Sequence, residues 1–275
     1  MRIDAHVHFL VYDPREHTWV TDELGALKRS FLPDKLEPLL RRAGFGGCIA
    51  VEARQLPHET GWLLDLARAH ASIRGIVGWV DLCAPDVTAR LEGLAVYPQI
   101  KGFRHVVIDE PDERFLLRDD FQRGIAALGP LGFTYDLLIL PRQAAAAVQL
   151  ARKFPEQRFV LDHLGLPDIR ARELVPWEAG LKELAACPNV FCKLSGLVYR
   201  ADWQRWWPGD FGPYLDIALE LFGPARLMVG SNWPVCTVAG DYDTVLGIVL
   251  DRIRTLSQGE QAQILGKTCA SFYNL

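Results

Sequence analysis

The chain has 275 residues, of which 49% are hydrophobic and 23% are charged. This is enough apolar material for one large core or two small ones. The net charge is −4, so the chain lacks the excess of positive charge that is typical of nucleic-acid-binding proteins, and we expect no nucleic-acid partner. No apolar run is long enough to cross a bilayer, and the first residues, "MRIDAHVHFL", carry charge and histidine where a signal peptide needs an apolar stretch. We therefore expect a cytoplasmic protein with no membrane partner.

The cysteines give no sign of a structural zinc site or a redox motif, because none of them form a CxxC pair. In a long, apolar chain we expect them to be reduced and mostly buried. The six are Cys48, Cys83, Cys187, Cys192, Cys236 and Cys269.

Short runs rich in Val, Ile, Leu or Phe recur along the chain, and longer segments with helical periodicity lie between them. The predicted strands cover residues 2–9, 47–53, 74–80, 100–107, 133–139, 158–163, 190–196 and 226–232. The predicted helices cover residues 33–44, 58–71, 141–154, 176–187, 214–223 and 241–256. Proline near the start of the first and third helices is a typical helix start signal.

Eight strands that alternate with helices predict a parallel (β/α)₈ barrel of the TIM type, as one domain over residues 1–275. The alternative is an open doubly wound sheet, but the glycine-rich phosphate loop that such a sheet often carries is missing. Segment 197–211 follows the seventh strand and is dense in Trp, Tyr and Arg. It could form a wall of a pocket, or its tryptophans could cover the barrel or a contact in a homo-oligomer.

Polar side chains end nearly every predicted strand, where a TIM barrel builds its active site. His6 and His8 end the first strand, and alternation places both, together with Asp4, on the interior face. Two histidines at this spacing could share a metal or a substrate oxygen. A purely structural role is the simpler alternative for each residue. Glu52 or Arg104 could belong to a structural ion pair, and a single histidine such as His105 or His163 could be a hydrogen-bonded core residue. The other residues at strand ends are Trp79, His105, Asp136, Asp162, His163, Lys193, Ser195, Ser231 and Asn232.

Five segments, taken together and in this order, resemble the amidohydrolase superfamily. They are "DAHVHF", "KGFRHVV", "DHLGLPDI", "CKLSGL" and "LMVGSNWPVC", and they span residues 4–236. The strongest similarity is to the amidohydrolase-2 branch with its L-fuconolactonase-like and L-rhamnonolactonase-like enzymes. The resemblance implies a (β/α)₈ barrel that hydrolyses a small sugar-acid (aldono) lactone, an L-fucono- or L-rhamnonolactone, by attack of an activated water.

The chain departs from the superfamily pattern at two positions. The stretch "FTYDLLI" has Asp136 and no histidine on strand five, and Asn232 stands where the pattern has an aspartate. The metal ligands that the resemblance carries over are His6, His8 and His163. Three imidazoles could hold one divalent metal such as zinc. The lactonase branch also tolerates a metal-free site, so both alternatives stay open.

The resemblance and the chemistry of ester hydrolysis together suggest roles for these residues. We assign the three histidines and Asn232 to the region of the carbonyl and the water. Arg104 and Lys193 could steady negative charge or a substrate hydroxyl. The remaining substrate-binding residues in this hypothesis are Glu52, His105, Trp79 and Trp203, with Trp206 or Trp207 as equivalent choices for stacking on the sugar.

The general base is open, because the amide of Asn232 cannot accept a proton near neutral pH. Asn232 could replace an aspartate in an engineered, substrate-trapping variant. Alternatively it is natural and orients the water, with His163 or His8 as base, since an unperturbed imidazole pKa near 6.5 suits that role. Two other functions are weighed against the lactonase: a metal-dependent decarboxylase of the same superfamily and a non-catalytic sugar-acid binding protein.

Overall fold

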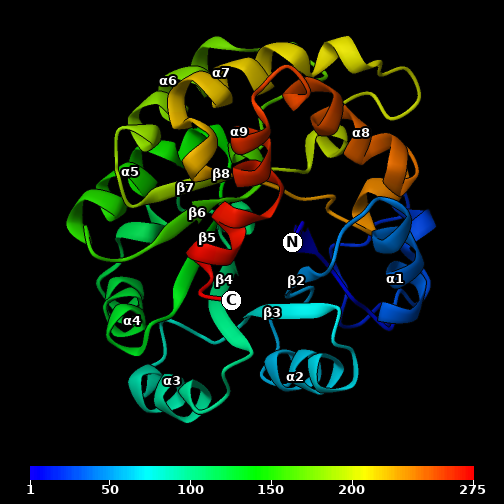
Figure 1. Cartoon of the computed structure of the whole chain (residues 1–275). Coiled ribbons are helices and arrows are strands. Elements are labelled where there is room, and N and C mark those ends of the chain that lie inside the picture. The colour runs from blue at the N-terminus through cyan, green and yellow to red at the C-terminus, as the bar shows by residue number, and fades with distance from the viewer.

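The computed structural model describes residues 1–275 and contains one sheet of eight parallel strands in sequential order (Figure 1). The predicted barrel is confirmed, and each strand overlaps its predicted range but is shorter. The strands are β1 (Asp4–Val7), β2 (Cys48–Val51), β3 (Ile73–Gly78), β4 (Ile100–Val106), β5 (Thr134–Leu138), β6 (Phe159–Leu161), β7 (Val190–Leu194) and β8 (Leu227–Val229).

The sheet closes between β8 and β1 through the residues that follow β8. Val7 forms a parallel bridge with Trp233. The backbone N–H of Asn232 donates to the carbonyl of His6 at 2.9 Å, and the N–H of His8 donates to the carbonyl of Trp233 at 2.7 Å. The seam of the barrel therefore holds His6, His8 and Asn232 side by side.

Helices surround the barrel (Figure 1). They are α1 (Pro33–Arg42), α2 (Glu59–Ala69), α3 (Val87–Ala95), α4 (Asp119–Leu128), α5 (Ala144–Lys153), α6 (Val175–Ala185), α7 (Gly212–Phe222), α8 (Tyr242–Ile253), α9 (Gln258–Ala262) and α10 (Thr268–Phe272). The six predicted helices are present. Helices α3, α4, α9 and α10 were not predicted, and the last two are only five residues long each. No helix is both long and apolar enough to cross a membrane.

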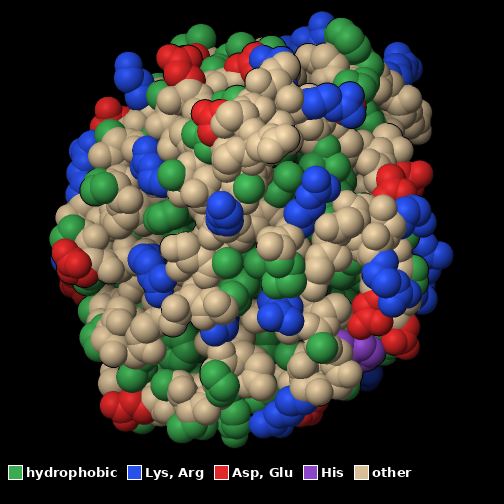
Figure 2. Space-filling model, viewed as in Figure 1, with side chains coloured by type: hydrophobic (Ala, Val, Ile, Leu, Met, Phe, Trp, Pro, Cys, Tyr) green, Lys and Arg blue, Asp and Glu red, His purple; other side chains and the backbone are tan.

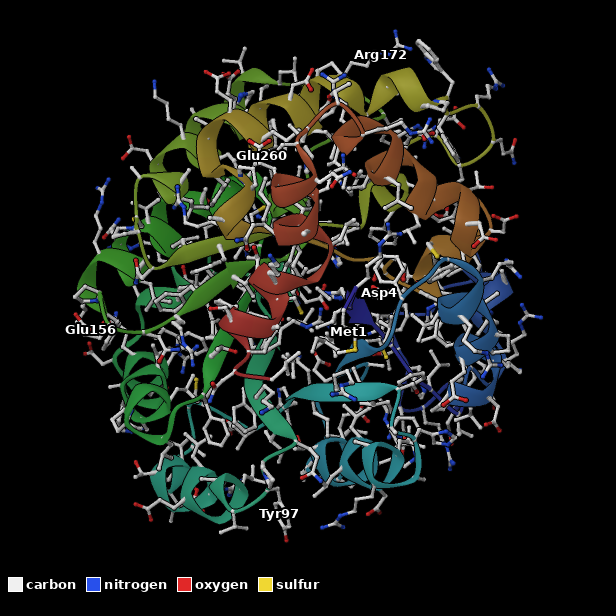
Figure 3. All side chains as sticks on the ribbon, in the orientation of Figure 1. Met1, Asp4, Tyr97, Glu156, Arg172 and Glu260 are labelled. Atoms are coloured by element: carbon white, nitrogen blue, oxygen red, sulfur yellow. The ribbon has the colours of Figure 1, made fainter.

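The core has two parts. A cluster of 71 buried residues includes residues from both the strands and the surrounding helices, and a cluster of 10 joins barrel residues such as Ile3, Val77 and Met228 to Phe272 and Tyr273 at the C-terminus. The last helix thus closes the end of the barrel where the strands begin, near Met1 and Asp4 (Figure 3). The space-filling view shows this end filled by side chains, with Lys and Arg scattered over it (Figure 2). All six cysteines are free, and five are buried.

The prediction that Asp4 shares a face with His6 and His8 is wrong. The register of β1 against β2 shifts between Asp4 and Val7, so simple alternation does not hold along this strand. The Asp4 carboxylate accepts hydrogen bonds from the N–H of Ser231 at 2.9 Å and from the hydroxyl of Tyr242 in α8 at 3.0 Å. Asp4 therefore ties β1 to β8 and to an outer helix.

Candidate active site

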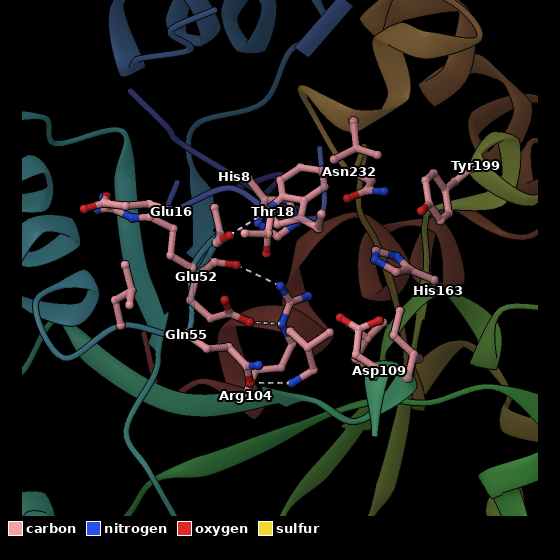
Figure 4. A pocket seen from close by; sticks show the side chains of 18 of the residues that line it. His8, Glu16, Thr18, Glu52, Gln55, Arg104, Asp109, His163, Tyr199 and Asn232 are labelled. Atoms are coloured by element: carbon pink, nitrogen blue, oxygen red, sulfur yellow. Dashed lines mark hydrogen bonds and ion pairs between the residues drawn. The ribbon is translucent and has the colours of Figure 1, made fainter. Parts of the chain in front are cut away.

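A cavity of about 680 Å³ opens at the C-terminal ends of the strands (Figure 4). Five residues predicted from the sequence line it: His8, Glu52, Arg104, His163 and Asn232. His6 lies directly behind them, because its Nε2 is 3.1 Å from Nε2 of His8. Residues from β1, β2, β4, β6 and β8 thus converge at one end of the barrel, which is where the fold builds its active sites.

The three histidines are held in fixed orientations. Nδ1 of His8 bonds the carbonyl of Val51 at 2.9 Å, and Nδ1 of His163 bonds Oγ of Ser195 at 2.8 Å. Nε2 of His163 is therefore left for the site, whereas Nε2 of His8 contacts Nε2 of His6 at 3.1 Å. Burial, reinforced by the nearby Arg104 cation, lowers the pKa of His8 to about 3 and that of His163 to about 3. The expectation of an unperturbed imidazole pKa is wrong, and both rings are neutral at physiological pH.

An unusual backbone segment presents His163. Residues 163–166 have φ values of 55°, 54°, 71° and 52°, all in the left-handed region. Only the residue at position 165 is a glycine, so this conformation costs energy that the surrounding packing must supply. His163 and Leu166 both line the cavity from this turn. Asn232 is also left-handed, with φ of 57°, a conformation that asparagine tolerates better than most residues.

A buried network of charges lies under the cavity. Nε of Arg104 donates to Oε1 of Glu52 at 2.7 Å, and Nη1 donates to Oδ2 of Asp162 at 3.1 Å. Nζ of Lys193 pairs with Asp136 and lies 2.9 Å from Oδ1 of Asp162. With neutral histidines, three carboxylates face only two cations, so the network carries one excess negative charge when fully ionised. A buried excess of this kind favours uptake of a cation or a proton.

Asp162 of this network and two of the histidines form a group that could hold a divalent metal. Ligand atoms of His6, Asp162 and His163 lie within 4.8 Å of one another, and all three residues are buried. Neutral imidazoles and a carboxylate are ordinary zinc ligands. In addition, Oδ1 of Asn232 is buried and accepts no hydrogen bond from the chain, so it fits a donor that comes from a substrate or a water.

Four predicted substrate-binding residues do not line the cavity. Lys193 is fully buried beneath His6, with Nζ 3.1 Å from Nδ1 of His6. The indole N–H of Trp79 donates to Gln55, and that of Trp203 to the carbonyl of Tyr199. His105 bonds Glu110 at 2.7 Å and stacks on the ring of Phe115. Their role in substrate binding stays a prediction.

Sequence reasoning missed several residues of the cavity wall, notably Trp19, Asp109 and Tyr199. Asp109 follows the end of β4 by three residues, so a wider search beyond each strand end would have found it. Tyr199 is the part of segment 197–211 that lines the cavity, whereas Trp207 in that segment is exposed. The loop before α1 carries no pattern in the sequence that marks Trp19.

Comparison with known proteins agrees with this geometry. The amidohydrolase family model matches residues 3–275. The chain belongs to the amidohydrolase family. It is 40% identical to an L-fucono-1,5-lactonase of Burkholderia multivorans and 34% identical to one of Burkholderia ambifaria, covering 100% of this chain and 96% of each relative. A crystal structure of an amidohydrolase from Burkholderia multivorans with bound zinc superimposes with a TM-score of 0.96 at 40% identity, covering 100% of this chain and 99% of that one.

Proposed function

We propose that this amidohydrolase opens a sugar-acid lactone to the free acid, with L-fucono-1,5-lactone as the first substrate to test. The observation that carries this is the 40% identity, over the whole chain, to a relative named for that reaction. The cavity of about 680 Å³ has the size of a small-molecule site and a mixed polar and apolar wall that suits a polyhydroxylated ring.

The chemistry of the site matches the needs of lactone hydrolysis, which are an oriented and activated water, a stabilised oxyanion and a proton for the leaving alkoxide. The side-chain oxygen Oδ1 of Asn232 has no partner in the chain and can accept a hydrogen bond from the attacking water. Nε2 of His163 is the ring nitrogen that faces the site, since Ser195 occupies Nδ1. Arg104 fixes Glu52 at the cavity wall.

We propose that His6, Asp162 and His163 hold one divalent cation, with zinc as the first candidate. Their convergence and the excess negative charge of the network support this proposal. A bound cation would act as a Lewis acid on the lactone carbonyl. Elemental analysis of the purified protein, with activity measured before and after chelation, tests it. Full activity in protein that contains less than a tenth of an equivalent of metal, roughly, would contradict it.

The test of the function is a panel of aldonolactones assayed with a pH indicator, with and without chelator. We expect acid release from at least one lactone at a rate proportional to the protein concentration. His163→Gln should lower this rate, whereas His70→Gln, which changes a histidine that pairs with Glu37 outside the cavity, should not. Rates equal to spontaneous hydrolysis for every lactone would contradict the proposal and favour a protein that only binds sugar acids.

A further inference from the structure

Glu52 occupies a position that an ordinary ion pair does not explain. It follows β2 directly, is 1% exposed and yet lines the cavity. Its Oε1 accepts from Nε of Arg104 at 2.7 Å, and Nη2 of the same guanidinium donates to the Glu52 carbonyl at 2.8 Å. These two bonds fix one carboxylate oxygen, while Oε2 accepts no hydrogen bond from the chain. Figure 4 shows this side chain beside Arg104, on the cavity wall across from His163 and Asn232.

The other ionisable groups of the cavity are less suited to move a proton near neutral pH. Nε2 of His8 lies 3.1 Å from Nε2 of His6, and His163 is one of the three proposed ligands of the divalent cation. Asn232 has no ionisable group. Burial raises the pKa of Glu52 to about 7, against the opposing effect of Arg104 on β4 and with smaller contributions from Glu59 of α2 and Asp162 after β6. A pKa near the operating pH suits a group that first takes up and then returns a proton.

We propose that Glu52 is the general base, and then the general acid, of lactone hydrolysis, in place of an aspartate at position 232. The inference rests on the proposed function. In the first step the ionised carboxylate takes a proton from water, the water oxygen bonds to the carbonyl carbon, and the C=O electron pair moves to oxygen. In the second step the C=O bond re-forms, the bond to the ring oxygen breaks, and the Glu52 carboxyl returns the proton to that oxygen. The product is the hydroxy acid.

Arg104 and Asn232 support the proposed role of Glu52 without exchanging a proton themselves. Arg104 is a positioning residue, because its guanidinium holds Glu52 by both side chain and backbone and is itself anchored by Asp162. Asn232 orients the water through Oδ1, and its neutral amide leaves Glu52 as the base. An aspartate at position 232 is therefore not needed, and Asn232→Asp should not increase turnover.

The decisive experiment compares kcat/KM for an accepted lactone in the wild type and in Glu52→Gln, from about pH 5.5 to about pH 8. The wild-type value should rise with pH through about 7, since the base must be ionised. Glu52→Gln should lose this rise and fall by about 10²- to 10⁴-fold. Asp109→Asn, which changes another carboxylate of the cavity wall, should raise KM and keep the rise with pH. Glu92→Gln, on the exposed face of α3, should match the wild type.

A second variant guards against a folding defect. Glu52→Ala leaves space for a small carboxylate, so added formate should restore part of its activity and should have no such effect on Asp109→Ala. Thermal melts of each variant check that the fold is kept. A rise through about pH 7 that persists in Glu52→Gln, or a large gain in turnover in Asn232→Asp, would overturn the role of Glu52 while the lactonase function stands. A wild type that hydrolyses no lactone would overturn both.

Discussion

The two ends of the barrel differ in composition, since one is apolar and the other is charged. The end where the strands begin is closed by α10 and Tyr273 over an apolar cluster that includes Ile3 and Met228. The end where the strands finish holds three carboxylates, two cations and three histidines around a cavity. The ends meet at Asp136, which accepts from the Tyr273 hydroxyl at 2.9 Å and pairs with Lys193.

This contrast assigns stability to one end and chemistry to the other, as is general for the fold. The apolar end gains free energy from burial, whereas the charged end is costly unless every charge is paired. Mutations at the apolar end should therefore change the free energy of unfolding and leave kcat/KM alone. Mutations at the charged end should change kcat/KM, and those that strip a charge of its partner should also change stability.

The largest effect is expected for Lys193→Met, because it leaves two fully buried carboxylates without their ammonium partner. We expect a loss of about 3–5 kcal/mol in the free energy of unfolding, together with a fall in kcat/KM as His6 loses its contact. Urea denaturation and the lactone assay measure the two effects. Lys182→Met, on the exposed face of α6, is the control. A loss of less than about 1 kcal/mol would show that the network tolerates the missing cation.

Phe272→Ala tests the apolar end. This ring is 1% exposed and packs against Phe191 and Tyr273, so its removal should cost about 3–5 kcal/mol of stability. At a temperature where the variant is folded, kcat/KM should equal that of the wild type. A fall of more than about tenfold in kcat/KM would mean that the two ends are coupled, against the separation described above.

Gly196→Ala tests how closely the charged end positions His163. A Cβ at residue 196 would lie 2.5 Å from Cγ of His163, so the ring must move, and a displacement near 1 Å can cost about 10²-fold in rate. Gly132→Ala is a matched control, since Gly132 also has a left-handed φ but nothing lies within 4 Å of its added Cβ. Both variants should lose stability, and only Gly196→Ala should lose activity. Equal activity in the two variants would show that the contact between residue 196 and His163 does not position the His163 ring for catalysis.

The smallest effect is expected at the junction of the ends. Tyr273→Phe removes a hydroxyl that bonds both oxygens of Asp136, which should cost about 1.5–3 kcal/mol of stability. The lost bonds also favour the protonated carboxyl, so the pKa of Asp136 should rise further above its already raised value of about 6. Chemical denaturation at two pH values measures this. A larger loss of stability at the lower pH than at the higher one would contradict the expected rise in the pKa of Asp136.

The sequence predicted the barrel because its strands are buried on both faces and appear as apolar runs. It also predicted five cavity residues, since strand ends mark the active end of this fold. It could not predict how far each side chain lies from the cavity. Lys193 and Trp79 have the expected strand positions, but Lys193 lies beneath the cavity wall and Trp79 lies beside it. Alternation failed at Asp4 because β1 shifts register. The pKa values of the histidines depend on burial and on Arg104, which no local pattern reveals.

The most direct test of the account is the pH dependence of acid release from L-fucono-1,5-lactone by the wild type and by Glu52→Gln, measured side by side. The account predicts a wild-type rate that is proportional to protein concentration and rises through about pH 7, and a variant that is at least about 10²-fold slower with no such rise. Equal rates and equal pH profiles in the two proteins would contradict it.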